Sequence, residues 1–391
     1  MSDIHYSLDD IRQRLNELDD QLLNLLSERR KMSIEVAKSK VQTSKPVRDA
    51  RREQELLVKL INNGKSKYHL DAEYITKLFH TIIEDSVLLQ QAYLQELANP
   101  DHQKPLARVA FLGSKGSYSH LASHEFFSRK NMELVEINCE AFKEVAKTVE
   151  SGHADYGVLP IENTSSGSIN EVYDLLQHTT LYIVGELTLP IEHCLVGVSD
   201  IRLEEISVLY SHPQPHQQCS EFLGRLKNVQ LKTCASTADA MKKVQKLNRP
   251  DVAAIGNSSS GKLYGLQALQ GNIANQTENH TRFIVVARKP VEVSTQIPAK
   301  STLIMSTSQQ AGSLVQTLLV LQRYGINMTK LESRPIMGNP WEEMFYVDLE
   351  AHLDSEGMQQ ALNELTKITK HLKVLGCYPT ENIKATQVKL S

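Results

Sequence analysis

The sequence lacks a long apolar run and a strong excess of charge of one sign. No stretch approaches the roughly 20 apolar residues that a membrane-spanning helix requires. The amino-terminal "MSDIHYSLDD" is acidic and has no apolar signal core. The net charge of -3 gives no general reason to expect nucleic acid or an anionic membrane as a partner. A cytoplasmic protein is therefore expected.

The sequence also lacks paired cysteines and a dinucleotide-binding fingerprint. Its five cysteines are scattered without the spacing of a zinc site or of a thiol-disulfide motif. They are Cys139, Cys194, Cys219, Cys234 and Cys377. Such a set is typical of reduced thiols that serve mainly in packing. No metal site and no cofactor is predicted, and the missing G-x-G-x-x-G motif argues against an NAD-dependent dehydrogenase.

The 391 residues, of which 41% are hydrophobic and 23% charged, favour a soluble protein of two or three domains. Helical periodicity fills residues 1 to 96 and predicts three helices. The first runs near 8 to 41, the second from Pro46 to the "NNG" at Asn62 to Gly64, and the third from Asp71 to about Leu97. The polar segment 97 to 108 is interpreted as a linker.

From about 107 to 290 the pattern changes to short β-rich runs that alternate with helical stretches. This alternation indicates an open α/β sheet, and the length allows two lobes around a cleft. A third unit, over 299 to 386, has the order strand, helix, strand, strand, helix, strand. That βαββαβ order is the ferredoxin-like arrangement, which fold alone does not assign to a role.

The first helix carries cations on the apolar stripe that should be buried. The stripe runs through Leu8, Ile11, Leu15, Leu18, Leu22, Leu25, Met32 and Val36. Continuing it reaches Arg29 and then Lys40, while Ser86 and Gln90 interrupt the stripe of the third helix. A solvated charge run is one interpretation of "SERRK". The alternative is a shared polar pocket for an anionic ligand, because an unpaired buried arginine is costly.

The helical region resembles the all-α chorismate mutase domain, through "IRQRLNELDDQLLNLLSERR", "VAKSK", "PVRDARRE" and "IIEDSVLLQQ". The resemblance implies a pocket of Arg12, Arg29, Lys40, Asp49, Arg52, Glu53, Ser86 and Gln90. In that family two protomers intertwine, and the arginine matching Arg12 enters the partner's site, so a homodimer is expected. We assign Lys40 and Gln90 to the ether oxygen of chorismate and Glu53 to its hydroxyl.

Three polar stretches follow strands in the α/β region, and each can be explained by an ordinary structural role as a turn or a helix cap. They are "FLGSKGSYSHLA", where a helix opens near Ser117; "GVLPIENTSSGSI", where a strand ends at Pro160 before a helix start; and the proline-stiffened turn "YSHPQPHQQCS". Together with "NHTRFIVV" they resemble prephenate dehydratase over about 107 to 290. The resemblance implies a two-lobed, periplasmic-binding-protein-like α/β fold.

The same resemblance makes Thr281 the general acid that helps prephenate lose carbon dioxide and hydroxide. It implies Ser117, Asn163, Gln218 and Arg282 as substrate-side or supporting residues, with a structural ion-pair role as the alternative for Arg282. The sequence departs from the family at Ser114, where proline is usual, and at "GNSSSGKLYGL", where alanines are more usual.

The third unit resembles the phenylalanine-binding ACT domain through "QAGSLVQTLLVL" and "LESRPI". The bland alternative is a glycine-started helix and a surface strand end. The resemblance implies a regulatory site, in which Ser313 stands where alanine is usual. Its residues are Gly312, Ser313, Leu314, Val315, Glu332, Ser333 and Arg334.

Taken in order, these matches resemble the bifunctional P-protein family of phenylalanine biosynthesis. The expected fold is multidomain, with an all-α mutase domain, a two-lobed α/β dehydratase domain and an α+β ferredoxin-like ACT domain. The expected ligands are chorismate, prephenate and L-phenylalanine, the last as a feedback inhibitor. The alternative is a non-catalytic solute sensor with a helical dimerisation arm.

Overall fold

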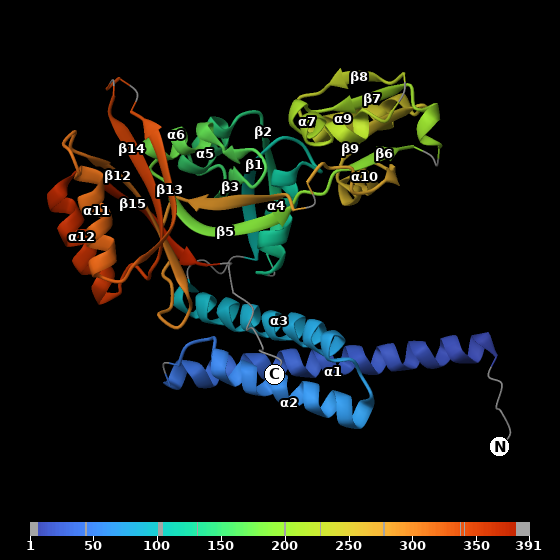
Figure 1. Cartoon of the computed structure of the whole chain (residues 1–391), viewed down its shortest axis with the longest axis horizontal. Helices are drawn as coiled ribbons and strands as arrows, with labels where there is room; N and C mark the ends of the chain where they lie inside the picture. The colour runs from blue at the N-terminus through green and yellow to red at the C-terminus, as the bar shows by residue number, and fades with distance from the viewer. Residues whose placement is uncertain are drawn as a thin grey trace. The chain divides into compact units, whose positions relative to one another are not determined.

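A computed structural model describes residues 7–43, 45–100, 105–130, 132–198, 201–226, 228–276, 278–336, 338–339 and 341–380. The chain forms two compact units (Figure 1). The first contains the three amino-terminal helices together with residues 293–297, and the second contains the remaining sheets and helices. Residues 101–104 of the predicted linker and 381–386 of the predicted third unit lie outside the described residues.

The helical unit consists of α1 (Leu8–Thr43), α2 (Ala50–Tyr68) and α3 (Ala72–Ala98). The bounds predicted for the first and third helices are confirmed, but those of the second are wrong. The carboxylate of Asp49 caps α2 by accepting the Arg52 N–H at 3.0 Å, so the helix begins after Pro46. Gly64 lies inside the helix, where Ile75 packs so closely that a Cβ would lie 2.1 Å from Ile75 Cδ1. The helix ends at Tyr68, and His69 is its left-handed cap.

The apolar stripe of α1 is exposed in the single chain, contrary to the expectation that it is buried. Leu15, Leu22 and Leu25 are 53%, 52% and 61% exposed. Only Ser33 and Ala37 of this 36-residue helix are buried. A stripe of this length is unusual on the surface of a monomer, because contiguous exposed apolar patches generally mark interaction sites.

The α/β part of the second unit has two sheets, one per lobe, which confirms the two-lobed arrangement. The first lobe contains β1 (Leu106–Leu112), α4 (Tyr118–Ser128), β2 (Glu133–Cys139), α5 (Phe142–Glu150), β3 (Tyr156–Asn163), β4 (Gly167–Ser168), α6 (Asn170–His178), β5 (Tyr182–Pro190) and β11 (His280–Ala287). Its strand order is β2-β1-β3-β11-β5, with β4 paired to β3. The chain thus returns from the second lobe as β11, between β3 and β5.

The second lobe has the strand order β10-β6-β9-β7-β8. Its elements are β6 (Cys194–Gly197), a 3-10 turn (Leu203–Glu205), β7 (Val208–Ser211), α7 (Pro213–Gln218), α8 (Ser220–Leu223), β8 (Gln230–Thr233), α9 (Thr237–Leu247), β9 (Val252–Gly256), α10 (Ser258–Leu263) and β10 (Gln267–Gln270). The predicted proline-stiffened turn is instead the helix α7, because His212 caps its start and Pro213 suits a first helical position.

A second correction concerns the segment after β3. The strand continues through Pro160 to Asn163, and the following polar residues form the β3–β4 turn rather than a helix start. The Asn163 side chain accepts the N–H groups of Ser165 and Ser166, which closes the turn. The helix predicted there, α6, begins only at Asn170.

The remaining elements confirm the βαββαβ order. They are β12 (Ala299–Thr307), α11 (Ser313–Arg323), β13 (Asn327–Pro335), β14 (Glu343–Glu350), α12 (Glu356–Ile368) and β15 (Thr369–Pro379). The sheet order is β13-β14-β12-β15, and α11 and α12 cover one face (Figure 1). Val347 packs on those helices, whereas Tyr346 belongs to the same hydrophobic core as Tyr173 of α6. The four-stranded sheet therefore shares a core with the first lobe.

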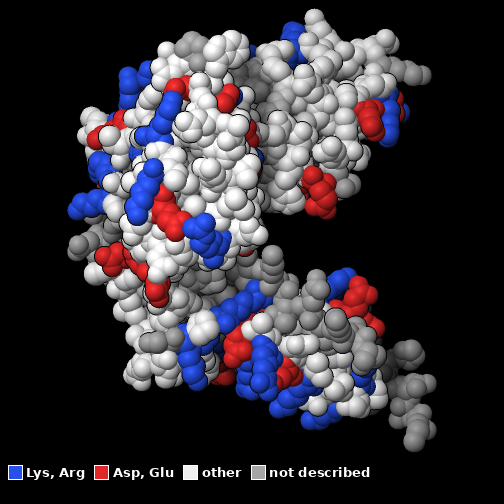
Figure 2. Space-filling model, turned by 60° about the vertical axis from the view of Figure 1, so that its left-hand side comes forward, with Lys and Arg blue, Asp and Glu red and all other residues white. Residues whose placement is uncertain are grey.

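The surface, the thiols and the helix lengths add three observations. On the face seen in Figure 2, positive and negative side chains are interspersed over the helical unit. All five cysteines are buried and unpaired, as predicted. Among the described residues, no helix is both long enough and apolar enough to cross a bilayer.

Candidate active sites

The first candidate site lies between α1 and α3. Arg29 Nη1 donates to Ile82 O at 3.1 Å and also contacts Ser86 Oγ, while Lys40 Nζ lies 3.1 Å from Gln90 Oε1. Arg29 and Lys40 are about three helical turns apart, so both extend from the same side of α1. The two cations therefore face α3, and the interpretation of "SERRK" as a fully solvated charge run is wrong for Arg29.

The electrostatics of this site follow from partial burial. Burial lowers the pKa of Arg29, and nearby Asp85 only partly opposes it. Burial likewise lowers the pKa of Lys40, opposed by Asp49 and Glu53. Two cations held where water is scarce are most stable next to an anion. The arrangement is suited to bind a negatively charged ligand.

The other residues predicted for this pocket divide into two groups. Glu53 is buried, and its carboxylate accepts Arg48 Nε at 3.1 Å. Asp49 and Arg52 are exposed. The Asp49 carboxylate caps α2 by accepting the Arg52 N–H. Arg12 is exposed and lies 3.6 Å from Asp9. Of the predicted pocket residues, the structure thus brings Arg29, Lys40, Ser86 and Gln90 together. It does not bring Arg12 to them.

Arg48 is a residue that the sequence analysis missed. Its side chain is 17% exposed, and it pairs with Glu53 at 3.1 Å. It stands in the same "PVRDARRE" motif, and its proximity to Glu53 in the sequence was the available signal. Because Arg48 fixes the Glu53 carboxylate, it positions the group that we assigned to the substrate hydroxyl.

The second candidate site is built on the pairing of β3 with β11. Thr281 and Asn163 lie opposite one another, and Asn163 Nδ2 is 2.9 Å from Thr281 Oγ1. The Asn163 Oδ1 accepts two backbone N–H groups from the β3–β4 turn, at 3.0 and 2.9 Å. These bonds orient the amide so that its NH₂ group faces Thr281. The Thr281 oxygen consequently accepts a hydrogen bond, and its own hydrogen remains available for donation.

Asn279 and His193 are the supporting residues that the sequence analysis missed. Asn163 Nδ2 also donates to Asn279 Oδ1 at 2.7 Å, and Asn279 lies two residues before Thr281. The period-two alternation of a strand was the signal that could have found it. His193 Nε2 lies 2.8 Å from Gln218 Oε1, and burial lowers the pKa of His193. A neutral His193 thus orients the amide of Gln218.

A cavity of about 410 Å³, a volume in the range of small-molecule sites, is lined in part by Asn279, which accepts a hydrogen bond from Asn163. Thr281 and Asn163 themselves are not among its lining residues. It is lined by both lobes: Ser165, Ser166, Gln214, Gln217, Gln218, Ala274, Asn275, Gln276 and Asn279. Gln214 Nε2 donates to Ser166 Oγ at 2.8 Å and so connects α7 to the β3–β4 turn. The cavity is therefore lined by neutral hydrogen-bonding groups from both lobes.

Arg282 and Ser117 do not share this arrangement. Arg282 follows Thr281 on β11, so its side chain points to the opposite face of the sheet. There its guanidinium binds Glu186 at 2.8 Å, Asp348 at 2.6 Å and Glu162 at 3.1 Å. The structure therefore favours the structural ion-pair alternative and corrects the substrate-side assignment.

Ser117 has a structural explanation as well. Its Oγ accepts the His120 N–H at 3.2 Å and donates to Leu112 O at 3.2 Å. Ser117 is therefore the cap of α4, as the predicted helix start near Ser117 requires. These two bonds occupy the hydroxyl in the described structure.

The predicted regulatory residues fall into two groups. Gly312, with φ 84°, precedes α11, and Ser313 to Val315 form its first turn. Glu332 accepts Ser168 Oγ at 2.6 Å, and Arg334 binds Asp174 through two bonds of 2.9 and 2.8 Å. Ser333 is exposed on the other side of β13. Glu332 also pairs with Lys330 of its own strand at 3.4 Å. Outside β13, these contacts of Glu332 and Arg334 are with the first lobe, not with the start of α11.

The whole chain resembles known proteins in the order of its units. Residues 11–91 match the type II chorismate mutase family, and residues 109–291 match the prephenate dehydratase family. A protein of Enterobacter agglomerans described as a bifunctional chorismate mutase/prephenate dehydratase is 57% identical over 373 residues, covering 95% of this chain and 96% of that protein. A protein of Escherichia coli (strain K12) with the same description is 55% identical over the same shares.

A solved structure also resembles much of this chain. The prephenate dehydratase of Arthrobacter aurescens in complex with L-Phe is 25% identical, with a TM-score of 0.64 over 72% of this chain and 93% of that chain. Together with the relatives that match along 95% of its length, these similarities show that the chain belongs to the bifunctional chorismate mutase/prephenate dehydratase family, which converts chorismate to prephenate and prephenate to phenylpyruvate.

Proposed function

We propose that Arg29, Lys40, Ser86 and Gln90 bind chorismate in the helical unit. The inward direction of the two cations is the observation that carries this proposal. Chorismate is a dianion, and arginine suits carboxylates because its planar fork binds them bidentately. Asp49, which caps α2, and Arg52 and Glu53 of α2 complete the pocket, with Arg48 orienting Glu53.

The rearrangement to prephenate is pericyclic and needs neither proton transfer nor a covalent intermediate. The residues have to hold the compact reactive conformer and to stabilise the negative charge that develops on the ether oxygen. Lys40 and Gln90 are assigned to that oxygen because their polar ends meet at 3.1 Å. Losing one such donor should reduce turnover by about 10²-fold or more.

A second copy of the chain completes this site in the proposal. Arg12 and Lys40 are 28 positions apart on one helix, which corresponds to about 42 Å. Arg12 is therefore out of reach of the pocket that contains Lys40 on its own chain. The exposed stripe of α1 is the surface on which two copies would pair, and pairing would bring Arg12 to the partner's pocket.

The dehydratase reaction is assigned to Thr281, with Asn163 as its positioning residue. The carboxylate leaves prephenate as carbon dioxide, its electron pair forms the aromatic ring, and the ring hydroxyl departs. Thr281 donates its hydrogen to that hydroxyl, which leaves as water, and Oγ1 regains a proton from solvent before the next turnover. A threonine hydroxyl is a weak acid, and the bond from Asn163 Nδ2 at 2.9 Å helps to stabilise the charge left on Oγ1.

The substrate of this step is assigned to the cavity between the two lobes. Gln218 and Asn279 line it, and each is fixed by a second residue, His193 and Asn163 respectively. Preorganised neutral donors suit a step in which charge moves from a carboxylate to a hydroxyl. Ser117 and Arg282 have no direct role in this proposal.

The βαββαβ unit is proposed to be an ACT domain that binds L-phenylalanine as feedback inhibitor. The bound L-Phe of the related dehydratase supports this effector. Gly312, Ser313, Leu314 and Val315 form the start of α11, where the N–H groups of Gly312, Leu314 and Val315 face the position of the amino-acid carboxylate in the proposal. The N–H of Ser313 donates to Gln310 O at 3.1 Å. Ser333, Glu332 and Arg334 of β13 complete the regulatory set.

The route from effector to active site is proposed to run through the contacts of β13 with the first lobe. Glu332 binds Ser168 beside the turn that Asn163 closes, and Arg334 binds Asp174. Inhibition requires phenylalanine to bind better to one conformation of these contacts than to another. The same proposal places the domain bounds at 1–96, 107–290 and 299–386. It also includes the likeness of the two lobes to periplasmic binding proteins and a cytoplasmic location.

A coupled assay with chorismate tests the assignment of the two sites. Lys40→Ala should abolish formation of prephenate and spare dehydration of supplied prephenate, whereas Thr281→Ala should do the reverse. Equal loss of both activities in either variant would contradict separate sites. Glu332→Gln should weaken inhibition by phenylalanine, and unchanged inhibition would remove Glu332 from the regulatory set. Binding of chorismate without any turnover would favour the non-catalytic sensor.

A further inference from the structure

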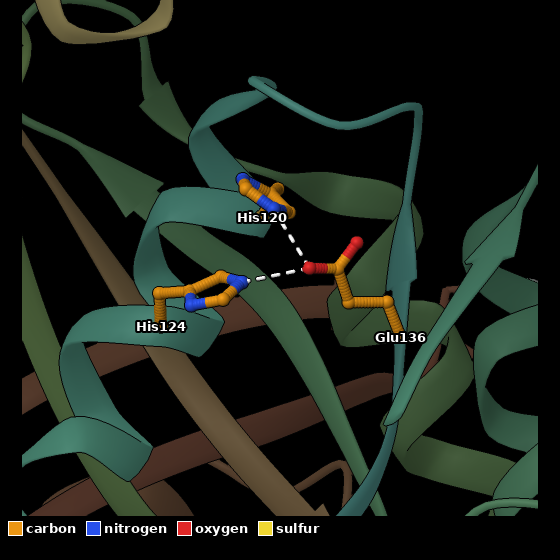
Figure 3. Close-up of side chains that lie close together, drawn as sticks. All are labelled: His120, His124 and Glu136. Atoms are coloured by element: carbon orange, nitrogen blue, oxygen red, sulfur yellow. Dashed lines mark hydrogen bonds and ion pairs between the residues drawn. The ribbon is translucent and has the colours of Figure 1, made fainter. Parts of the chain in front are cut away.

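Two histidines of α4 and one glutamate of β2 form a cluster outside both active sites. His120 Nε2 and His124 Nε2 point at the same oxygen of Glu136, at 3.3 and 2.9 Å (Figure 3). Among the described residues, this is the one group of three or more histidine, cysteine, aspartate or glutamate side chains with ligand atoms within 4.8 Å of one another. Neither proposed reaction uses any of these side chains.

The fold brings the three side chains together by simple periodicity. His120 and His124 are four residues apart, so they lie one above the other on one side of α4. β2 pairs in parallel with β1, and α4 packs on both strands, which places Glu136 opposite the two rings. Two histidines at this spacing on a helix are the arrangement that zinc sites use.

The two nitrogen-to-oxygen distances are close to those around a tetrahedral ion, and all three ligand atoms lie within 4.8 Å of one another. With zinc bonds of about 2.0–2.1 Å, neighbouring ligand atoms of a tetrahedron lie about 3.3 Å apart. The two observed nitrogen-to-oxygen distances differ from this value by only a few tenths of an ångström. The two rings already face one another, with centroids 4.5 Å apart.

The charges around the cluster are mixed. Glu136 supplies the carboxylate that faces both rings, and Lys115 is the neighbouring positive charge that opposes a bound cation.

We propose that His120, His124 and Glu136 bind one divalent transition-metal ion, with zinc as the expected occupant. Two imidazoles and one carboxylate are a ligand set of open zinc sites, in which a fourth position remains for water. The side chains of His124 and Glu136 are 48% and 28% exposed, so the ion can enter from solvent. The ion would join α4, which Ser117 caps, to β2 of the same lobe.

The test uses the full chain without a polyhistidine tag and zinc chloride as the probe, with equilibrium dialysis as the measurement. The wild-type chain should bind one zinc ion through this site. His124→Gln and Glu136→Gln should each weaken binding by at least about tenfold, since even outer-shell changes cost 10- to 100-fold. The matched control is His178→Gln on the exposed end of α6, which should bind as the wild type does.

Two further readouts keep the result interpretable. Dehydration of supplied prephenate should be unchanged in both variants, which verifies that the lobe is folded. Cobalt bound to the wild type should give the visible spectrum of a four-coordinate ion, and the variants should lose it. A wild-type chain that binds zinc no better than His124→Gln, or affinity unchanged in Glu136→Gln, overturns the three-ligand site.

Discussion

Replacing Arg282 with methionine tests whether this residue is structural. The substitution keeps an apolar stem but removes the guanidinium, whose side chain is only 11% exposed. It breaks the bonds to Glu186, Asp348 and Glu162 at once. Lys300 would still pair with Glu186 and Lys330 with Glu162, but Asp348 would retain only its described bond from Thr302.

The magnitude follows from the buried carboxylate left without its cation. Removing one partner of a buried ion pair costs about 3–5 kcal/mol. For a unit of this size, about 2–4 °C are lost per kcal/mol. Arg282→Met should therefore lower the melting temperature of the second unit by roughly 6–20 °C in scanning calorimetry. A second substitution, Asp348→Asn, should restore part of that loss because it removes the orphaned charge.

The matched control is Arg129→Met, which breaks an exposed ion pair with Glu125 on α4. Exposed pairs are worth about 0–1 kcal/mol, so this variant should melt close to the wild type. The structural assignment is refuted if Arg282→Met melts within about 1 °C of the wild type. A variant with unchanged stability and strongly reduced dehydratase turnover would instead support the substrate-side assignment.

Three further predictions concern other features. Gly376→Ala should destabilise the second unit by about 3 kcal/mol in chemical denaturation, because a Cβ there would lie 2.1 Å from Ile183 O. The control is Gly271→Ala, which has open space around it and should be nearly neutral. Equal effects of the two substitutions would contradict this explanation. Because burial lowers the pKa of Lys40, the mutase rate should begin to fall at a pH below the usual lysine pKa of about 10.4. Lys40→Arg should remove that fall if the variant keeps mutase activity, because arginine stays charged. The pH profile of the mutase rate measures both effects. Leu22→Glu should separate a dimer into monomers in sedimentation and abolish mutase but not dehydratase activity, whereas a dimer that persists would exclude the α1 stripe as the interface.

The sequence predicted element types well where periodicity was long. The first and third helices and the βαββαβ order follow from repeated apolar spacing, which depends on many residues at once. The second helix was misplaced because Pro46 and Gly64 are locally typical of helix ends. Asp49 provides a stronger cap, and the glycine is required instead by the close approach of Ile75. The start was thus decided by a local cap that outcompetes Pro46, whereas the glycine inside the helix answers to a tertiary contact, which a local pattern does not contain.

The candidate sites show the same division. The inward cations of the helical unit were predicted because a charge on an apolar stripe is a sharp anomaly. The role of Arg282 was left open, although strand alternation alone separates it from Thr281. The cluster at Glu136 was missed because its two histidines come from a helix and its carboxylate from the next strand. Only the spacing of "SHLASH" was visible, and a pair of histidines does not by itself indicate a third ligand.

The length of α1 has a genetic consequence. If one end of this 36-residue helix serves its own chain's pocket and the other end serves the partner's, two different defective alleles can rescue each other. A chain carrying Arg12→Ala and a chain carrying Lys40→Ala are each inactive alone, but their hybrid assembles one intact site and one doubly damaged site. Random mixing yields hybrids in half of all pairs, so co-expression should restore about a quarter of wild-type prephenate formation.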